Sequence, residues 1–349
     1  MTFYFVDREA DGVQYRIFNY RLASSYSQFL QPGALECRGV MFEMDAGNKD
    51  NAARTAKPIR LAALPMPKFF NLNENPLTRN LDLSKTEDIM LKADGSLIST
   101  YIHIHDNDDG EPMHELCLKS KASVDSVQCK GAMEWLAQDE NSSFREELFN
   151  LTSQGTTVNL EWCAPQNRVV LEYTKPTLSV LNMRDMVNGD FVKKPSSQHP
   201  EISNRFIEHV KTEDPVQFIN TIKDQKGIEG YVVRLDDGQL VKIKTTWYLH
   251  LHHCKGKLNS NPQVFDAVVD ECTDDLKSLF QHDATALRKI ELFEEFVAGE
   301  YNRVVNTVED FFERNKHLDV KRYVTLGKKN LASEYFHLAM LKFRGHEFC

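Results

Sequence analysis

Apolar and polar residues alternate with a period of two in several segments of this chain, and the alternation limits the folds that it can adopt. The clearest case is residues 239–244, in which Lys242 and Lys244 alternate with valine and isoleucine. Successive side chains of a β-strand point to opposite faces, so the pattern predicts a strand with one packed face and one polar face. An Asp-Gly pair precedes this segment and predicts a hairpin over residues 229–244. The same alternation is present in residues 96–105, 116–121 and 158–162.

Charged residues lie on or beside the polar sides of these predicted strands. The residues concerned are Lys92, Lys119, Lys121, Glu161, Glu229, Lys242 and Lys244. A sheet with one packed and one open face would collect them into one groove. Amines gathered in this way repel one another unless a polyphosphate lies between them, and the repulsion would favour the neutral, nucleophilic form of a lysine amine. For any single pair of lysines, an ordinary solvent-exposed strand face is the simpler explanation.

Lys92 begins the sequence Lys-Ala-Asp-Gly-Ser at the start of one predicted strand. A lysine amine can attack a nucleoside triphosphate and hold the nucleotide as a covalent phosphoramide, provided that burial and neighbouring cations activate it. Asp94 could orient the nucleotide or the amine, and Gly95 would let the backbone come close to the nucleotide. The motif is short, and an exposed turn before a strand would have the same sequence. It therefore needs support from other segments.

The periodicity of the chain changes near residue 255. Before this point, further strands are expected at residues 15–20, 40–44, 169–173 and 178–183. Helices are expected in the same part at residues 123–153, 201–212 and 215–224. From about residue 262 onward, apolar residues recur with helical spacing. We therefore expect an α+β fold, with twisted antiparallel sheets and flanking helices over residues 1–254 and an all-α domain over residues 255–349.

Composition restricts the cellular setting and the partners. The formal net charge is −9 at pH 7, so a phosphate-binding protein of this composition must concentrate its cations in one place. No run of apolar residues is long enough to cross a membrane, and the first residues lack the pattern of a secretory signal. The seven cysteines never form a Cys-x-x-Cys pair, which is typical of free thiols in a reducing compartment and disfavours zinc. We expect a cytoplasmic protein without a membrane partner.

The charged segments occur in the order and approximate spacing of motifs I, Ia, III, IV and V of the covalent nucleotidyltransferases. This superfamily contains DNA ligases, RNA ligases and mRNA capping enzymes. The matching segments are Lys92-Ala-Asp-Gly-Ser, Lys119-Ser-Lys121, Leu160-Glu161-Trp162, residues 229–232 and residues 241–244. Further segments resemble more narrowly the bacteriophage RNA ligase 1 family, the ATP-dependent tRNA-repair ligases. These segments are residues 15–18, 35–39, 68–75 and 247–248.

The resemblance implies an ATP site in the adenylation domain, residues 1–254. Lys92 would be the adenylated nucleophile, and Lys242 and Lys244 would bind the α-phosphate as charge builds in the transition state. Glu161 would bind the ribose. Glu229 would complete the catalytic group. The other contacts to ATP would come from Tyr20, Arg38, Lys68, Lys121 and Tyr248.

The same resemblance implies a divalent cation, Mg²⁺ or Mn²⁺. Glu229 would lie on the metal side of the pocket, where carboxylate oxygens suit Mg²⁺. Asp274 matches a cation site that the family places in its helical domain, although an acidic pair at this position is also typical of a helix start. The chain departs from the family at Ala93, where an acidic residue is common, and at Ala122, where glycine is expected. Its amino terminus is expected to lack an initial helical segment.

The resulting hypothesis is an ATP-dependent RNA ligase that joins a 5′-phosphate to a 3′-hydroxyl through lysyl-AMP and an RNA-adenylate. The resemblance implies a substrate such as tRNA cleaved in the anticodon loop, with RNA or tRNA specificity in the helical domain. A separate polynucleotide kinase/phosphatase would prepare the ends, in the bacterial host cytoplasm if the chain is phage-encoded. Two alternatives stay open, namely another covalent nucleotidyltransferase (a DNA ligase or an mRNA capping enzyme) and a non-catalytic RNA-binding module.

Overall fold

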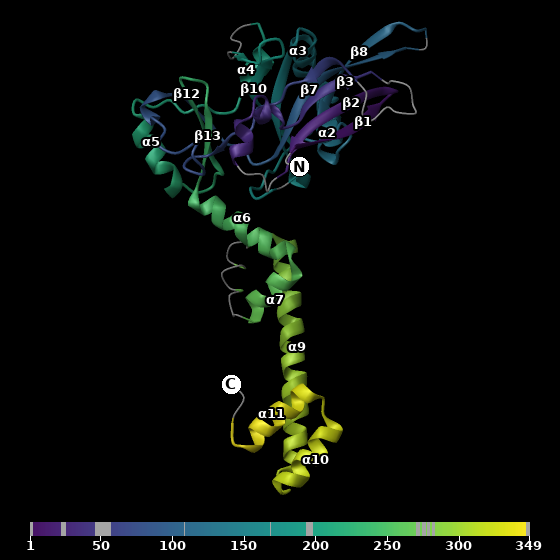
Figure 1. The fold of residues 1–349 in the computed structure, drawn as a ribbon, viewed down its shortest axis with the longest axis vertical. Helices are drawn as coiled ribbons and strands as arrows, with labels where there is room; N and C mark the ends of the chain where they lie inside the picture. The colour runs from purple at the N-terminus through teal and green to yellow at the C-terminus, as the bar shows by residue number, and fades with distance from the viewer. Residues whose placement is uncertain are drawn as a thin grey trace. The chain divides into compact units, whose positions relative to one another are not determined.

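Three β-sheets form the amino-terminal unit of the computed structural model, Met1–His250 (Figure 1). A second unit, Leu251–Cys349, contains helices, so the expected α+β class with a helical carboxy-terminal part is confirmed. The structure describes residues 3–21, 26–45, 57–107, 109–167, 169–192, 198–269, 273, 277, 280 and 283–346, with side chains for all of these except 253–259.

In the first sheet, each strand pairs antiparallel with the next along the chain. The strands are β1 (Phe3–Ala10), β2 (Val13–Tyr20), β3 (Val40–Met44) and β4 (Pro58–Ala63). Alternate residues of β2 point inward, and Tyr15 and Ile17 are fully buried beside Met41 of β3. Tyr101 of the second sheet belongs to the same apolar cluster, so the inner face of the first sheet packs against the second.

The second sheet has the strand order β11-β10-β9-β7-β8 and is antiparallel throughout. Its strands are β7 (Ser96–Asp106), β8 (Pro112–Lys119), β9 (Thr156–Cys163), β10 (Thr177–Asp185) and β11 (Phe191–Val192). The helices α2 (Val127–Leu136) and α3 (Ser142–Ser153) pack on it, so the helical segment expected at 123–153 forms two helices. Leu136, Leu148, Val158 and Leu160 are fully buried between these helices and the sheet.

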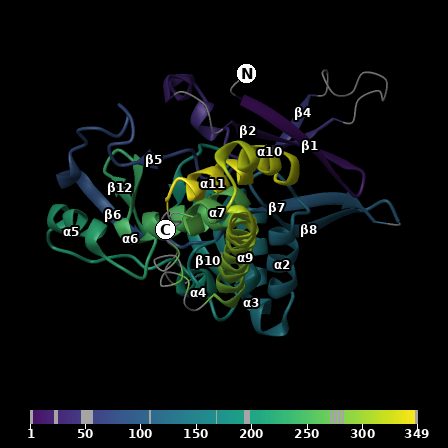
Figure 2. The same ribbon diagram turned by 90° about the horizontal axis from the view of Figure 1, so that it is seen from below.

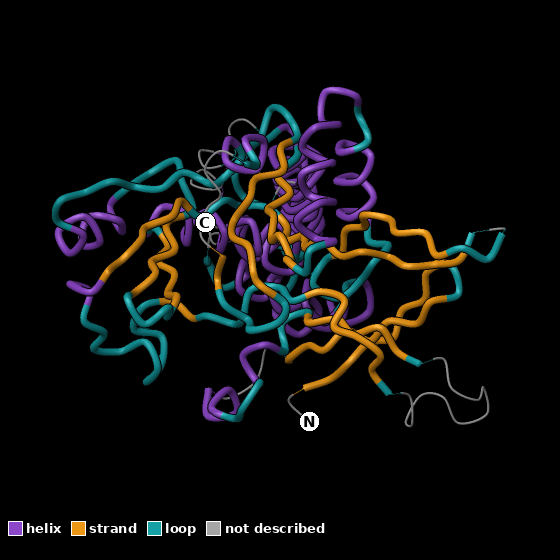
Figure 3. The backbone as a smooth tube through the Cα atoms, turned by 90° about the horizontal axis from the view of Figure 1, so that it is seen from above, coloured by secondary structure: helices purple, strands orange, loops and turns teal. Residues whose placement is uncertain are grey.

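The third sheet has the order β5-β13-β12-β6 and contains the predicted hairpin. Its strands are β5 (Phe70–Asn71), β6 (Thr86–Leu91), β12 (Gly230–Leu235) and β13 (Leu240–Lys244). β5 runs parallel to β13, and the other pairs are antiparallel. The helix α5 (Pro215–Thr221) packs on this sheet through Ile219. In Figure 3 these strands (orange, at the left) form a group apart from the other two sheets, and Figure 2 shows the same separation from below.

Two expectations about local structure are wrong. Residues 169–173 do not form a strand, because the carboxylate of Asp94 accepts hydrogen bonds from the Val170 and Leu171 backbone amides. The helix expected at 201–212 is only α4 (Pro200–Asn204). Beyond it, the chain is extended and forms bridges from Phe206 to β10 and from His209 to β6. Hydrogen bonding to open strand edges therefore competes successfully with helix formation in this segment.

The helical unit begins within α6 (Thr246–Asn259), close to the expected boundary at residues 254/255. The other helices are α7 (Asn261–Val269), α9 (Ala284–Asn315), α10 (Val320–Asn330) and α11 (Ser333–Phe343). Val308 and Phe311 of α9 pack with Tyr323 of α10 and Ala339 of α11. No helix in the described ranges combines the length and apolar character that a membrane span requires.

Candidate active site

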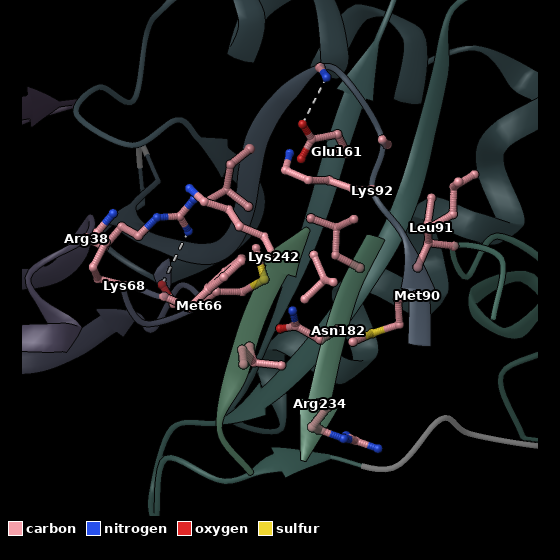
Figure 4. Close-up of a pocket in the computed structure, with 18 of the residues that line it drawn as sticks. Arg38, Met66, Lys68, Met90, Leu91, Lys92, Glu161, Asn182, Arg234 and Lys242 are labelled. Carbon is pink, nitrogen blue, oxygen red and sulfur yellow. Dashed lines mark hydrogen bonds between the residues drawn. The ribbon is translucent and has the colours of Figure 1, made fainter. Parts of the chain in front are cut away.

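A cavity of about 300 Å³ lies where strands and loops of all three sheets converge (Figure 4). Part of its wall is apolar, formed by Met66, Met90, Leu97, Leu181, Val232 and Leu240. The rest carries charges or aromatic rings, including Tyr20, Arg38, Lys68, Lys92, Glu161, Lys242 and Lys244. An acidic chain has therefore concentrated cations in one concave place, an arrangement that suits an anionic ligand with an apolar end.

The structure brings most of the predicted site residues into this wall and leaves others behind it. Lys121, Glu229 and Tyr248 contact lining residues but do not line the cavity themselves. Lys121 places its amine 4.3 Å from the centre of the Tyr20 ring. Asp274 lies outside the described residues.

Glu229 pairs with two of the predicted catalytic lysines. Its Oε2 accepts a hydrogen bond from the Lys92 amine at 2.7 Å, and its Oε1 lies 2.9 Å from the Lys244 amine. The strand register produces this arrangement, because Gly230, next to Glu229, lies opposite Lys244, and its carbonyl accepts the Lys92 backbone N–H. Glu229 is only 2% exposed, and a buried charge of this kind requires such pairing.

The loop that follows Lys92 is held by hydrogen bonds and by close packing. The buried Asp94 carboxylate accepts hydrogen bonds from the Val170 and Leu171 backbone amides. It also accepts one from the Tyr248 hydroxyl of α6 at 2.6 Å. It therefore anchors the loop and does not face the cavity, unlike the predicted orienting role. A Cβ atom on Gly95 would lie 2.3 Å from the Trp162 carbonyl oxygen. Glycine therefore allows the loop backbone to pack closely against β9.

Glu161 lies beside the nucleophile candidate. Its Oε1 accepts a hydrogen bond from the Gly95 backbone N–H at 3.0 Å, and Figure 4 shows the Lys92 amine next to the carboxylate. Burial raises the pKa of Glu161 to about 7, while the neighbouring Lys92 charge acts in the opposite direction. The group can therefore be neutral or ionised near neutral pH.

Two lysines that line the cavity, Lys242 and Lys68, have lowered pKa values, which favours their neutral forms. Burial, together with the charges of Lys68, Lys92 and Lys244, lowers the pKa of Lys242 to about 8. Burial also lowers the pKa of Lys68, whose amine lies 4.5 Å from the centre of the Phe70 ring. Such groups regain their charge when an anion enters, so the cavity suits an anionic ligand.

Several features of the cavity and of the loops around it carry no recognisable signal in the sequence. Asn182 of β10 lines the cavity and accepts a hydrogen bond from Asn159, but neither residue belongs to a motif. Arg184 is 5% exposed and donates hydrogen bonds to the Glu36 carboxylate and to the Pro65 carbonyl. It thereby connects the two loops that carry Arg38 and Lys68, a role that only the fold reveals.

The residues that the structure describes offer no group of three His, Cys, Asp or Glu side chains suited to a metal ion. Both carboxylate oxygens of Glu229 interact with ammonium groups. In this arrangement, Lys92 and Lys244 supply the positive charge that balances the Glu229 carboxylate.

Comparisons with known proteins agree over most of the chain. The model of a family described as RNA ligase matches residues 36–253, and that of the T4 RNA ligase 1 C-terminal domain matches residues 255–347. RNA ligase 1 of Bacteriophage TS2126 is 27% identical over 290 residues, which cover 79% of this chain and 66% of that protein, just under two thirds.

Structural likeness is weaker. A variant of the RNA ligase of Naegleria gruberi, solved with ATP and Mn, is 10% identical and overlaps 49% of this chain and 53% of its own with a TM-score of 0.34. Another variant, with AMP and Mn, gives a TM-score of 0.33 at 12% identity over 48% and 51%. Family membership rests on the sequence models. Since the RNA ligase model covers well over half of its length, the chain belongs to the RNA ligase family.

Proposed function

We propose that this protein is an ATP-dependent RNA ligase that joins a 5′-phosphate to a 3′-hydroxyl through a lysyl-AMP intermediate. The observation that carries the proposal is the position of Lys92, whose amine lies in a cavity lined by Arg38, Lys68, Lys242 and Lys244. A lysine that serves only solubility would lie on the exposed surface and not in a cavity among other cations. The apolar wall on the other side offers space for a nucleobase.

In the first step, the Lys92 amine attacks the α-phosphorus of ATP, and the bond to pyrophosphate breaks. The attacking amine must be neutral, and Glu229, 2.7 Å away, is placed to accept one proton from the ammonium group. The nitrogen loses a second proton, to the departing pyrophosphate or to solvent, as the P–N bond forms. Lys242 and Lys244 stabilise the charge that develops on the phosphate oxygens. The positions of Glu161 and Lys92 are compatible with a ribose bound beside the new phosphoramide bond.

In the second step, the RNA 5′-phosphate displaces Lys92 from AMP, and the lysine nitrogen regains the two protons that it gave up in the first step. In the third step, the RNA 3′-hydroxyl attacks the activated 5′-phosphate, and AMP leaves as the phosphodiester bond forms. The free lysine is then available for the next ATP. These steps need no oxidant or reductant, and each consists of one phosphorus–ligand exchange.

The proposal includes Mg²⁺ or Mn²⁺, which supplies positive charge to phosphate oxygens when bound. Once the Lys92 nitrogen carries AMP it is no longer an ammonium group, so Glu229, after releasing the proton that it accepted, would keep Lys244 as a charged partner. Its free carboxylate oxygen could then hold a cation, which is the metal-side role proposed for it. The cation site expected at Asp274 remains a prediction.

The finer part of the proposal concerns the substrate. We infer that the RNA is tRNA cleaved in the anticodon loop and that the helical unit, residues 251–349, contributes to its recognition. The match of residues 255–347 to the T4 RNA ligase 1 C-terminal domain supports this assignment. A polynucleotide kinase/phosphatase would act before this enzyme, because the sealing step requires a 5′-phosphate and a 3′-hydroxyl. The proposed compartment is the cytoplasm of a bacterial host.

The decisive experiment incubates the protein with ATP labelled at the α-phosphate. We expect label to become covalently attached to the wild type and to Lys85→Ala, because Lys85 is exposed and pairs with Asp236 away from the cavity. Lys92→Ala should lose about a thousandfold or more of the labelling, since the nucleophile is gone. Labelling that persists in Lys92→Ala would contradict the assignment.

Substrate competition separates the alternatives. Preference for ATP over GTP and for RNA over DNA strands in a sealing assay is expected for an RNA ligase. A capping enzyme would accept GTP, a DNA ligase would seal DNA, and a binding module would bind RNA without any covalent label. Sealing of a nicked anticodon stem-loop, compared with an unrelated RNA of equal length, tests the proposed tRNA substrate.

A further inference from the structure

Lys119, the last residue of β8, is a buried lysine that the proposed reaction steps do not use. It is 1% exposed, and within the described part of the chain its amine forms no ion pair with a carboxylate. The amine donates instead to two backbone carbonyls, those of Gly39 and Ser120, each at 2.8 Å. Burying an amine in this way is costly, so its bonds are expected to hold something specific in place.

Both carbonyls belong to segments that carry cations of the site. Gly39 directly follows Arg38, which lines the cavity, and Ser120 directly precedes Lys121, whose amine lies over the Tyr20 ring. These two segments are far apart in the sequence. The Lys119 amine therefore connects two cation-bearing turns that no backbone pairing joins directly in the sheet register.

The packing around Gly39 shows how closely these turns approach each other. Gly39 has a φ of 97°, and a Cβ atom there would lie 2.9 Å from the Lys121 carbonyl oxygen and 3.3 Å from the Lys119 amine. Asn19, fully buried, donates from its side chain to the same Lys121 carbonyl at 3.2 Å. The end of β2, which carries Tyr20, thus joins the cluster as well.

The number of hydrogen bonds fits a neutral amine. A neutral lysine amine has two N–H groups and an ammonium has three, and two carbonyl acceptors are present. Burial, with a smaller contribution from the neighbouring Arg38 charge and against an opposing one from Cys129, lowers the pKa of Lys119 to about 7. Near pH 8 the amine can therefore bind both turns without adding positive charge behind Arg38.

We propose that Lys119 is a positioning residue that fixes Arg38 and Lys121 relative to each other for binding the phosphate groups of the substrates. The proposal rests on the assignment of the cavity as the nucleotide site of an RNA ligase. Lys119 itself touches no substrate. Its effect is transmitted through the carbonyls of Gly39 and Ser120 and through the Asn19 contact that supports Lys121.

The test compares Lys119→Met with Lys130→Met in the full-length protein. Methionine keeps much of the side-chain volume but has no N–H donor, and Lys130 is an exposed lysine of α2. We expect Lys119→Met to raise the Kd for ATP in calorimetry, or the KM for 5′-phosphorylated RNA in sealing, by about tenfold. The kcat at saturating substrate should stay within about threefold of wild type, and Lys130→Met should match wild type in every measurement.

Asn19→Ala provides a second arm if Lys119→Met does not fold. It removes a neutral donor from the same cluster, and we expect a KM or Kd increase of about threefold in the same direction. Unchanged Kd and KM in a folded Lys119→Met protein, or in Asn19→Ala where only that variant folds, would overturn the proposal. If the wild type showed no covalent ATP labelling but Lys119→Met still raised the Kd for ATP, the ligase assignment would be refuted and the positioning role of Lys119 would stand.

Discussion

At the scale of single residues, the site depends on how like charges are balanced. The alternation of β13 was enough to predict that Lys242 and Lys244 share one face. It could not predict that Lys92 and Lys244 share the Glu229 carboxylate, because this depends on the register of β12 with β6 and β13. Among the described residues, Lys242 forms no ion pair with a carboxylate, and burial among other amines lowers its pKa to about 8.

This difference predicts proton uptake when ATP binds. In the free protein, Lys242 is about half deprotonated at pH 8, and phosphate oxygens would raise its pKa and restore the charge. The uptake from this residue should approach about half a proton per ATP at pH 8 and vanish near pH 6, where the amine is already protonated. Calorimetry of ATP binding in buffers with different ionisation enthalpies measures it.

Lys242→Arg is the matched variant for this measurement. Arginine keeps the positive charge but stays protonated over this pH range, so its own contribution to proton uptake is zero. We expect the uptake at pH 8 to fall by about half a proton relative to wild type. Equal uptake in the two proteins would show that Lys242 is fully charged before ATP binds.

At the scale of elements, local patterns predicted strands with a polar and an apolar face, and failed where another segment supplied the hydrogen bonds. The β12–β13 hairpin follows from its own alternation and its Asp-Gly turn. Residues 169–173 have the composition of a strand, but their amides bond to a carboxylate 76 and 77 positions away in the sequence. Residues 206–210 similarly bond to the edges of β6 and β10. Such competition depends on the assembled fold and leaves no local pattern.

The loop between β6 and β7 offers a test of packing at this scale. Gly95→Ala would place a methyl group 2.3 Å from the Trp162 carbonyl, so the loop must move away from β9 and take Lys92 with it. We expect the rate of covalent labelling by ATP to fall by about tenfold or more, and the free energy of unfolding to fall by about 1–3 kcal/mol.

Gly131→Ala is the control for this substitution. A Cβ atom at Gly131, in α2, has its nearest neighbour at 3.6 Å, and alanine is favoured over glycine in a helix. We expect normal labelling and equal or slightly greater stability by chemical denaturation. Gly95→Ala with wild-type labelling would mean that the position of this loop does not control the nucleophile.

At the scale of the whole molecule, every residue that lines the cavity belongs to the unit Met1–His250. The change of periodicity near residue 255 led us to expect a boundary there, because strand and helix periods differ strongly; the structure divides between His250 and Leu251. It could not show that α6, which crosses the boundary, also supports the site. Tyr248 of α6 is buried and bonds to Asp94, two positions after Lys92.

This connection predicts that two truncations, differing by a single helix, behave differently. A chain ending after residue 259 keeps α6 and the Tyr248–Asp94 bond, so we expect ATP labelling within about threefold of the full chain. If the helical unit recognises RNA, sealing of the nicked stem-loop should fall much more than labelling does. Parallel labelling and sealing assays on the same preparation measure both effects.

A chain ending after residue 245 lacks Tyr248 and leaves one oxygen of the buried Asp94 carboxylate without its hydroxyl donor. The expected cost is about 1–3 kcal/mol, together with loss of the packing that covers Lys244, whose amine lies 4.8 Å from the Tyr248 ring centre. Labelling should therefore be about tenfold or more below that of the 259-residue chain. Tyr248→Phe in the full chain separates the two causes, because it removes the hydroxyl and keeps the ring. Equal labelling by both truncations would show that α6 only connects the two units. A labelling defect shared by Tyr248→Phe and the shorter chain would show that loss of the Asp94 hydrogen bond causes it.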